Sequence, residues 1–125
     1  IQNRFIHNLF VCPNKNIEYF TKPSQVALKE LLDRNLQPEL IYIDGSHDPD
    51  VVITDLIMSW ELLKLGGIIL VNDITTWPNF KEKCPDYSKT TPTTIVNNFI
   101  QSNRNKIKNV LLPDMRQTAF MKVDG

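Results

Sequence analysis

Four side chains that can do acid–base or metal chemistry follow two apolar runs of the chain. Asp44 comes directly after the first run, and His47 lies three residues further on. Asn72 and Asp73 come directly after the second run. Carboxylate and carboxamide oxygens suit Mg²⁺, which takes few protein ligands and keeps several waters. A histidine beside them can act as a general base, because its ordinary pKa lies near neutrality.

Each of these side chains also has a plain structural alternative. Asp44 can cap a turn, and Asp73 can cap the loop that follows its strand. His47 can be a hydrogen-bonded loop histidine without a catalytic role. Spacing alone leaves both the chemical and the structural interpretation open for each residue. The choice depends on which strands carry these residues and whether those strands are neighbours.

The two apolar runs, Leu40–Ile43 and Ile68–Val71, predict neighbouring parallel strands. Both are short, continuously apolar and rich in β-branched residues, which is typical of strands covered on both faces. The amphipathic segment between them ends in two glycines and predicts the helical crossover that parallel strands need. Neighbouring strands lie about 5 Å apart. We therefore expect Asp44 and Asp73 to meet at the carboxyl rim of the sheet, where open α/β sheets bind ligands.

Capping signals and apolar spacing predict the other elements. Ser24, Asp48 and Thr91 each sit beside a proline at the start of a helical pattern, and Gly66 can take the left-handed conformation that ends the middle helix. The expected strands are Ile17–Thr21, Leu40–Ile43, Ile68–Val71, Lys106–Leu112 and Gln117–Val123. They alternate along the chain with a helix tail over 1–10 and with helices from Ser24, Pro49 and Pro92. A long loop is expected over 74–91, and a turn at Pro113-Asp114 joins the last two strands. This alternation predicts an α/β sheet, mostly parallel, with a closing antiparallel strand pair.

Bulk composition narrows the class of protein. The 125 residues suffice for one domain, and the formal net charge is zero, so we expect neither a nucleic-acid nor a membrane partner. No apolar run approaches the roughly 20 residues of a membrane span. Cys12 and Cys84 fit neither a disulfide framework nor a zinc pattern, which favours a cytoplasmic setting. Because the chain begins with Ile1 rather than Met, we expect it to be part of a longer product.

Several of these stretches together resemble the second half of a class I S-adenosylmethionine-dependent methyltransferase, in the branch of metal-dependent macrolide-sugar O-methyltransferases. The resemblance is carried by Leu40–His47, Asp55, Leu63–Asp73, Pro92–Phe99, Val110–Leu112 and Gln117–Lys122. It implies a Rossmann-like methyltransferase sheet with S-adenosylmethionine as methyl donor. It also implies that Asp44, Asn72 and Asp73 hold Mg²⁺ and that His47 takes the proton of the acceptor hydroxyl. The family commonly has an acid where this chain has Asn72.

The chain departs from the family in its first half. Its glycines are Gly45, Gly66, Gly67 and Gly125, so the glycine-rich strand and loop that hold the cofactor are missing, and no cofactor-binding residue is assigned. We expect residues 1–125 to form a single, incomplete methyltransferase domain. Without the missing strands, Ile17–Thr21 would have no neighbour and Leu40–Ile43 would have an open edge. Either these two strands collapse together, or two chains pair edge to edge into a homo-oligomer.

Two functions follow as hypotheses. The first is S-adenosylmethionine-dependent methyl transfer to the hydroxyl oxygen of a small-molecule acceptor, assisted by Mg²⁺. The second is a catalytically silent remnant or assembly module that lacks the cofactor-binding half. A phosphoacceptor receiver domain also places an aspartate at a strand end, but it needs an acidic pair after its first strand and a lysine after its fifth, and the sequence has neither.

Overall fold

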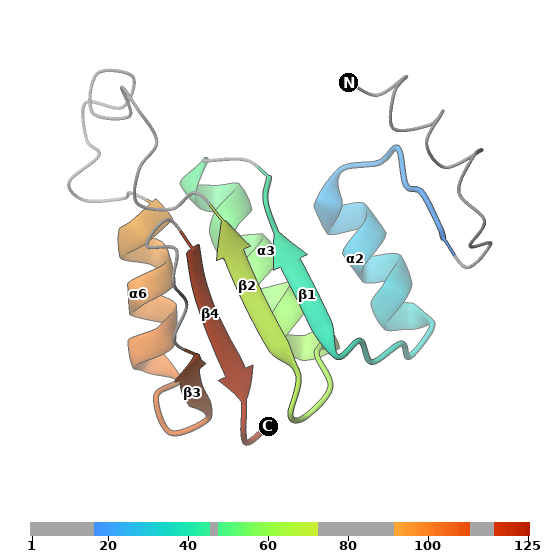
Figure 1. Cartoon of the computed structure of the whole chain (residues 1–125). Helices are drawn as coiled ribbons and strands as arrows, with labels where there is room; N and C mark the ends of the chain where they lie inside the picture. The colour runs from blue at the N-terminus through green and yellow to red at the C-terminus, as the bar shows by residue number, and fades with distance from the viewer. Residues whose placement is uncertain (1–16, 46–47, 73–91, 111–116) are drawn as a thin grey trace.

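The computed structural model describes residues 17–45, 48–72, 92–110 and 117–125 (Figure 1). These residues form three helices, α2 (Ser24–Asp33), α3 (Pro49–Leu62) and α6 (Pro92–Ser102), and four strands, β1 (Leu40–Ile43), β2 (Ile68–Asn72), β3 (Ile107–Val110) and β4 (Gln117–Lys122). The sheet order is β1-β2-β4-β3, with β1 and β2 parallel and the other two pairings antiparallel. The predicted α/β sheet with its closing strand pair is confirmed, but the described sheet is mixed and not mostly parallel, because β4 lies antiparallel between β2 and β3 and leaves one parallel pairing of three. The expected helix tail over 1–10, the loop over 74–91 and the turn at 113–114 lie outside the described residues.

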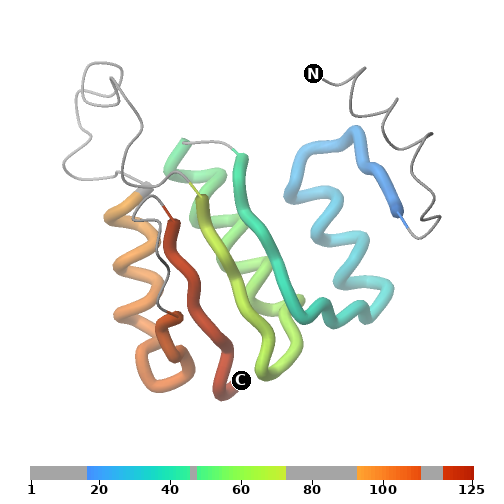
Figure 2. Tube along the Cα trace, in the orientation of Figure 1, coloured from blue at the N-terminus to red at the C-terminus, as the bar shows by residue number. Residues whose placement is uncertain are grey.

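The three helices lie on one face of the sheet, so this part of the chain has two layers (Figures 1 and 2). The core between the layers is apolar and consists of Val52, Leu56, Leu63, Ile69, Val71, Val96, Phe99 and Phe120. The rings of Trp60, Phe99 and Phe120 meet over it, with centroids 5.8 to 6.4 Å apart. Burial of this apolar surface fixes α3 and α6 against β2 and β4.

The start of α3 follows the predicted capping pattern. The Asp48 carboxylate accepts a hydrogen bond of 3.0 Å from the backbone N–H of Asp50, and Pro49 is the first helical residue. A capping side chain satisfies a backbone donor that has no partner within the helix. Asp48 therefore fixes where the chain turns from the end of β1 into the crossover helix.

The turn from α3 into β2 differs in detail from the prediction. The helix ends at Leu62, because Leu63 already has an extended backbone (φ −64°, ψ 132°), and Gly66 takes its positive φ of 87° within the following turn. A side chain at Gly67 is excluded, since its Cβ would lie 2.8 Å from the backbone oxygen of Lys64. Two glycines thus allow the tight turn that brings the chain back to the sheet.

Lys122 ties the end of β4 to the end of α3. Its ammonium donates hydrogen bonds to the backbone oxygens of Trp60 and Leu63, at 2.8 and 3.1 Å. Carbonyls in the last turn of a helix lack intrahelical partners, and a cation is favourable there. Burial lowers the pKa of Lys122 below its ordinary value of 10.5.

Two predictions at the N-terminal side are wrong. Ile17–Thr21 forms no strand, because no described strand lies beside it to complete its hydrogen bonds. The Arg34 guanidinium holds this segment instead through an ion pair of 2.7 Å with Glu18, whose hydrogen bond raises the pKa of Arg34. Ser24 is not the N-cap of α2 either, since that position is Pro23 and the Ser24 side chain bonds elsewhere.

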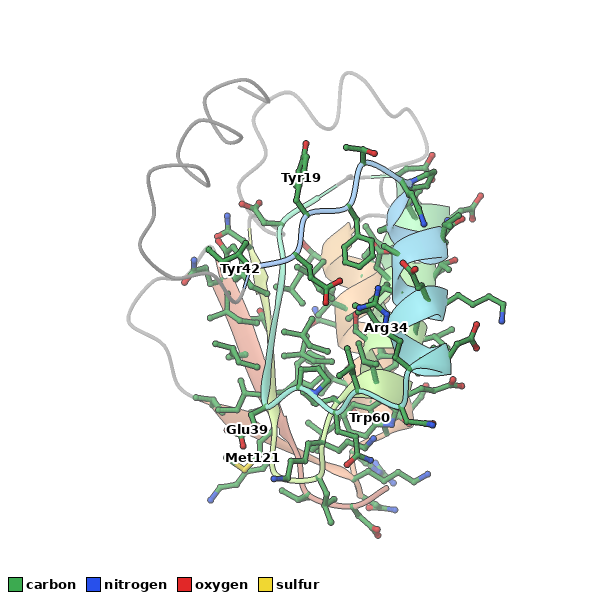
Figure 3. The ribbon with its side chains drawn as sticks, turned by 90° about the vertical axis from the view of Figure 1, so that its right-hand side faces the viewer. Tyr19, Arg34, Glu39, Tyr42, Trp60 and Met121 are labelled. Carbon is green, nitrogen blue, oxygen red and sulfur yellow. The ribbon has the colours of Figure 1, made fainter. Side chains whose placement is uncertain are left out.

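β1 forms one edge of the described sheet. It pairs with β2 and not with Ile17–Thr21, so the first of the two alternatives, a collapse of these strands onto each other, is wrong. Leu40 and Tyr42 are 63% and 52% exposed. Figure 3 shows Tyr42 and Met121 on the side of the sheet away from the helices, and Trp60 on the helix side. An edge strand that presents apolar side chains is a template for pairing with another chain.

Edge-to-edge pairing of two chains stays a prediction, and a charge on β1 tests it. We expect this 125-residue chain to have the molar mass of a dimer by light scattering, and Tyr42→Lys to shift it to the monomer, because an exposed lysine blocks edge pairing. Ile57→Lys, at a site 48% exposed on α3, should leave the dimer intact. A wild-type monomer at every protein concentration would contradict the prediction.

Candidate active site

The parallel register of β1 and β2 places Asp44 beside Asn72. Ile43 pairs with Val71 in the last step of the ladder, so the next residue of each strand reaches the carboxyl rim together. The Asn72 Nδ2 donates a hydrogen bond of 3.2 Å to the Asp44 Oδ1. The structure thus brings two of the four predicted site residues into contact across neighbouring strands.

Gln117 joins this pair from the other side of β2. It is the first residue of β4 and stands opposite Asn72 in the antiparallel ladder. Its Nε2 donates a hydrogen bond of 2.9 Å to the Asn72 Oδ1. The sequence reasoning missed Gln117 as a site residue, since only the register between β2 and β4 reveals it. The rim therefore carries a continuous chain of hydrogen bonds from Gln117 through Asn72 to Asp44.

The other two predicted site residues, His47 and Asp73, lie outside the described residues. Asp73 follows Asn72 directly in the sequence, and His47 follows Gly45 by two residues. Within the described ranges, no group of three or more histidine, cysteine, aspartate or glutamate side chains is placed to hold a metal. A cation site at this rim needs oxygen atoms from amides, or residues beyond these ranges, in addition to Asp44.

A hollow of about 330 Å³ opens beside the rim, between α2, β1 and α3. Its lining is mostly apolar, from side chains such as Leu28, Leu31 and Ile41, and it reaches Asp44. A larger groove of about 560 Å³ runs along α3 and α6, but none of the rim residues lines it. The smaller hollow is therefore the one that adjoins the candidate chemistry.

A buried carboxylate lies in the wall of the smaller hollow. Asp55 on α3 is 7% exposed and accepts a hydrogen bond of 2.7 Å from the Ser24 hydroxyl on α2. Ser59, one turn further along α3, is also buried. This contact explains why Ser24 does not cap its own helix, since its hydroxyl is committed to the neighbouring one. A buried carboxylate is costly unless it is hydrogen-bonded, so we assign Ser24 and Asp55 to the joint between the two helices.

The family model of the methyltransferase domain matches residues 4–74, which is more than half of the chain. The chain belongs to the methyltransferase-domain family. The matched residues include β1, α3 and β2, together with Asp44 and Asn72, so the family assignment covers both residues in contact at the rim. The predicted relationship to class I S-adenosylmethionine-dependent methyltransferases is confirmed.

Two solved methyltransferase structures share the fold. The MycE methyltransferase from the mycinamycin biosynthetic pathway, in complex with Mg and SAH, is 16% identical, with a TM-score of 0.63 over 90% of this chain. A Clostridium thermocellum protein assigned as an rRNA methylase is 16% identical, with a TM-score of 0.57 over 97% of this chain. The α/β sheet of this methyltransferase domain is therefore the Rossmann-like sheet of that fold. No curated protein matches the chain at a significant level.

The chain spans only part of the length of these structures, 34% of the MycE chain and 66% of the Clostridium thermocellum chain. At this level of identity the likeness concerns the fold. In the part of this domain that the structure describes, none of the helices has the length and apolar character that crossing a lipid bilayer requires.

The Ser24–Asp55 contact makes a testable contribution to stability. We expect Ser24→Ala to lower the free energy of unfolding by about 1–3 kcal/mol, because it leaves a buried carboxylate oxygen without its donor. Urea unfolding followed by circular dichroism measures the change. Ser102→Ala, at an exposed serine in the last turn of α6, should change it by less than about 0.5 kcal/mol. Equal effects of the two substitutions would show that the contact does not stabilise the domain.

Proposed function

We propose that this domain acts in S-adenosylmethionine-dependent methyl transfer to the hydroxyl oxygen of a small molecule. The observation that carries the proposal is the contact between Asp44 and Asn72, 3.2 Å apart at the carboxyl rim of neighbouring parallel strands, in a chain of the methyltransferase-domain family. That rim is where open α/β sheets bind their ligands.

In this proposal the chain's own side chains prepare the acceptor. His47 takes the proton from the acceptor hydroxyl, while the oxygen forms its bond to the methyl carbon and the bond from that carbon to sulfur breaks. S-adenosylhomocysteine is then the second product, so charge and atoms balance. Such an in-line displacement depends chiefly on positioning and on exclusion of water. The hollow beside Asp44, with its mostly apolar lining, provides a setting of that kind.

Asp44, Asn72 and Asp73 would hold Mg²⁺ in this proposal. The donor set fits, because Asp44 and Asn72 already lie within hydrogen-bond distance and both carry oxygen atoms of the type that Mg²⁺ prefers. The Asn72 oxygen is turned toward Gln117, so it reaches the carboxylate side after a half-turn of its amide group. When bound, the ion supplies a Lewis acid that orients the acceptor hydroxyl and lowers its pKa.

The charge of the chain favours a small acceptor over RNA. Formal net charge is zero, with 14 basic and 14 acidic residues. Nucleic-acid binding draws much of its affinity from basic side chains that neutralise phosphates. We therefore propose a small-molecule hydroxyl as the acceptor, although one of the two structural neighbours is assigned as an rRNA methylase.

Calorimetric titrations of the intact protein test this function. We expect saturable heats with S-adenosylmethionine and with Mg²⁺. Asp44→Asn should weaken Mg²⁺ binding by about tenfold or more, since it removes a charged ligand, and should leave S-adenosylmethionine affinity within about threefold. Asp48→Asn is the matched control, because asparagine also caps a helix and the change removes one nearby charge.

The outcomes separate the parts of the proposal. Absence of any heat with S-adenosylmethionine at high concentration would overturn methyl transfer. Equal loss of Mg²⁺ affinity in Asp44→Asn and Asp48→Asn would show that general charge, and not a site at Asp44, attracts the ion. Release of S-adenosylhomocysteine with a panel of small hydroxyl compounds then identifies the acceptor class.

A further inference from the structure

We propose that Gln117 is a positioning residue for Asn72, and that the two side-chain amides reverse their hydrogen bond together when a divalent cation binds at Asp44. This inference rests on the magnesium site proposed above. Its starting point is the chain of hydrogen bonds at the rim, in which Gln117 donates to Asn72 and Asn72 donates to Asp44.

The direction of this chain follows from the chemistry of its three groups. An ionised carboxylate only accepts hydrogen bonds, so Asp44 requires the NH₂ end of the Asn72 amide. The oxygen of that amide then faces away from Asp44 and toward β4, where Gln117 meets it with its own NH₂ end. Asn72 and Gln117 are each partly buried. If two amide oxygens or two NH₂ groups faced each other, water would not fully replace the lost hydrogen bond.

A cation at Asp44 demands the opposite orientation. Metal ions bind the oxygen of an amide and never its NH₂ group. The Asn72 oxygen must then face Asp44, and its NH₂ end must face Gln117. Gln117 can accept that hydrogen bond only by turning its own oxygen toward Asn72. Among the described residues its side chain has no other hydrogen bond to hold it, so the two amides can turn as a pair.

Gln117 has this positioning role because residue 72 carries an amide and not a carboxylate. With an acid at that position, both terminal atoms would be oxygens, and no rotation would be needed to present one of them to the cation. With Asn72, the neighbour decides which end faces the site. A glutamine can serve both orientations, because it carries a donor and an acceptor on one planar group.

Nuclear magnetic resonance of the side-chain amides tests the inference directly in the intact ¹⁵N-labelled protein. We expect the NH₂ signals of Asn72 and Gln117 to shift together during a Mg²⁺ titration, with the same midpoint. Gln117→Leu should leave the Asn72 signal responsive to Mg²⁺, because the contact with Asp44 is kept. Backbone amide signals of β2 and β4 report whether each variant keeps its fold.

A second variant predicts the direction of the effect. Gln117→Glu provides only acceptors, so the Asn72 NH₂ group then has a carboxylate on each side and is no longer required at Asp44 alone. We expect Mg²⁺ to bind about tenfold more tightly than in wild type, and the metal-free Asn72 signal to move toward the Mg²⁺-bound wild-type position. Gly45→Glu adds the same charge next to Asp44, where a Cβ meets nothing within 4 Å. It should not move the metal-free Asn72 signal to that position.

The possible results distinguish this inference from the proposed function. Mg²⁺ binding with an unmoved Gln117 signal would overturn the paired reversal and leave the magnesium site standing. Absence of Mg²⁺ binding in wild type and in Asn72→Asp would overturn the magnesium site and this inference with it. Binding of S-adenosylmethionine, measured separately, decides whether methyl transfer survives that result.

Discussion

The parallel pairing of β1 with β2, in one particular register, is the constraint on which the rim depends. A shift of one residue would send every side chain of β1 to the opposite face of the sheet. Backbone contacts before the strands fix the register, since Lys64 donates to the Pro38 oxygen and Ile68 to the Glu39 oxygen, each at 2.9 Å. The glycine turn after α3 makes these contacts possible. The approach of Asp44 to Asn72 is thus set at the far end of the strands.

The antiparallel pairing of β4 with β2 adds the second half of the rim. The Gly66 N–H donates to the Lys122 oxygen at 2.7 Å, which aligns the end of β4 with the start of β2. At the last residue of β2, the same alignment sets Gln117 opposite Asn72. One ladder therefore determines which side chain meets the amide of Asn72. A rim of mixed parallel and antiparallel strands collects side chains from the ends of β1 and β2 and from the beginning of β4.

Local signals in the sequence predicted the elements that are decided locally. The apolar runs of β1 and β2, the Asp48 cap and the apolar face of α6 all occur as expected. The wrong predictions concern residues whose structure depends on a partner far away in the sequence. Ser24 has the residue type of a cap, but a buried carboxylate 31 positions away claims its hydroxyl. Ile17–Thr21 has strand composition, but no strand in the described part of the chain pairs with it. Gln117 could not be assigned to the site without the register of two strands that are 45 positions apart in the sequence.

The two sides of the rim differ in how they are supported. Asn72 and Gln117 extend from β2 and β4, whose buried Ile69, Val71 and Phe120 belong to the apolar core. Asp44 extends from the edge strand β1. α2, which lines the hollow beside Asp44, packs on α3 but has no buried residue. Apolar burial resists displacement in proportion to the apolar area removed from water. The hydrogen bond from Asn72 to Asp44 therefore joins a firmly packed half of the rim to a less buried one, and a cation bound by both residues would strengthen the same joint.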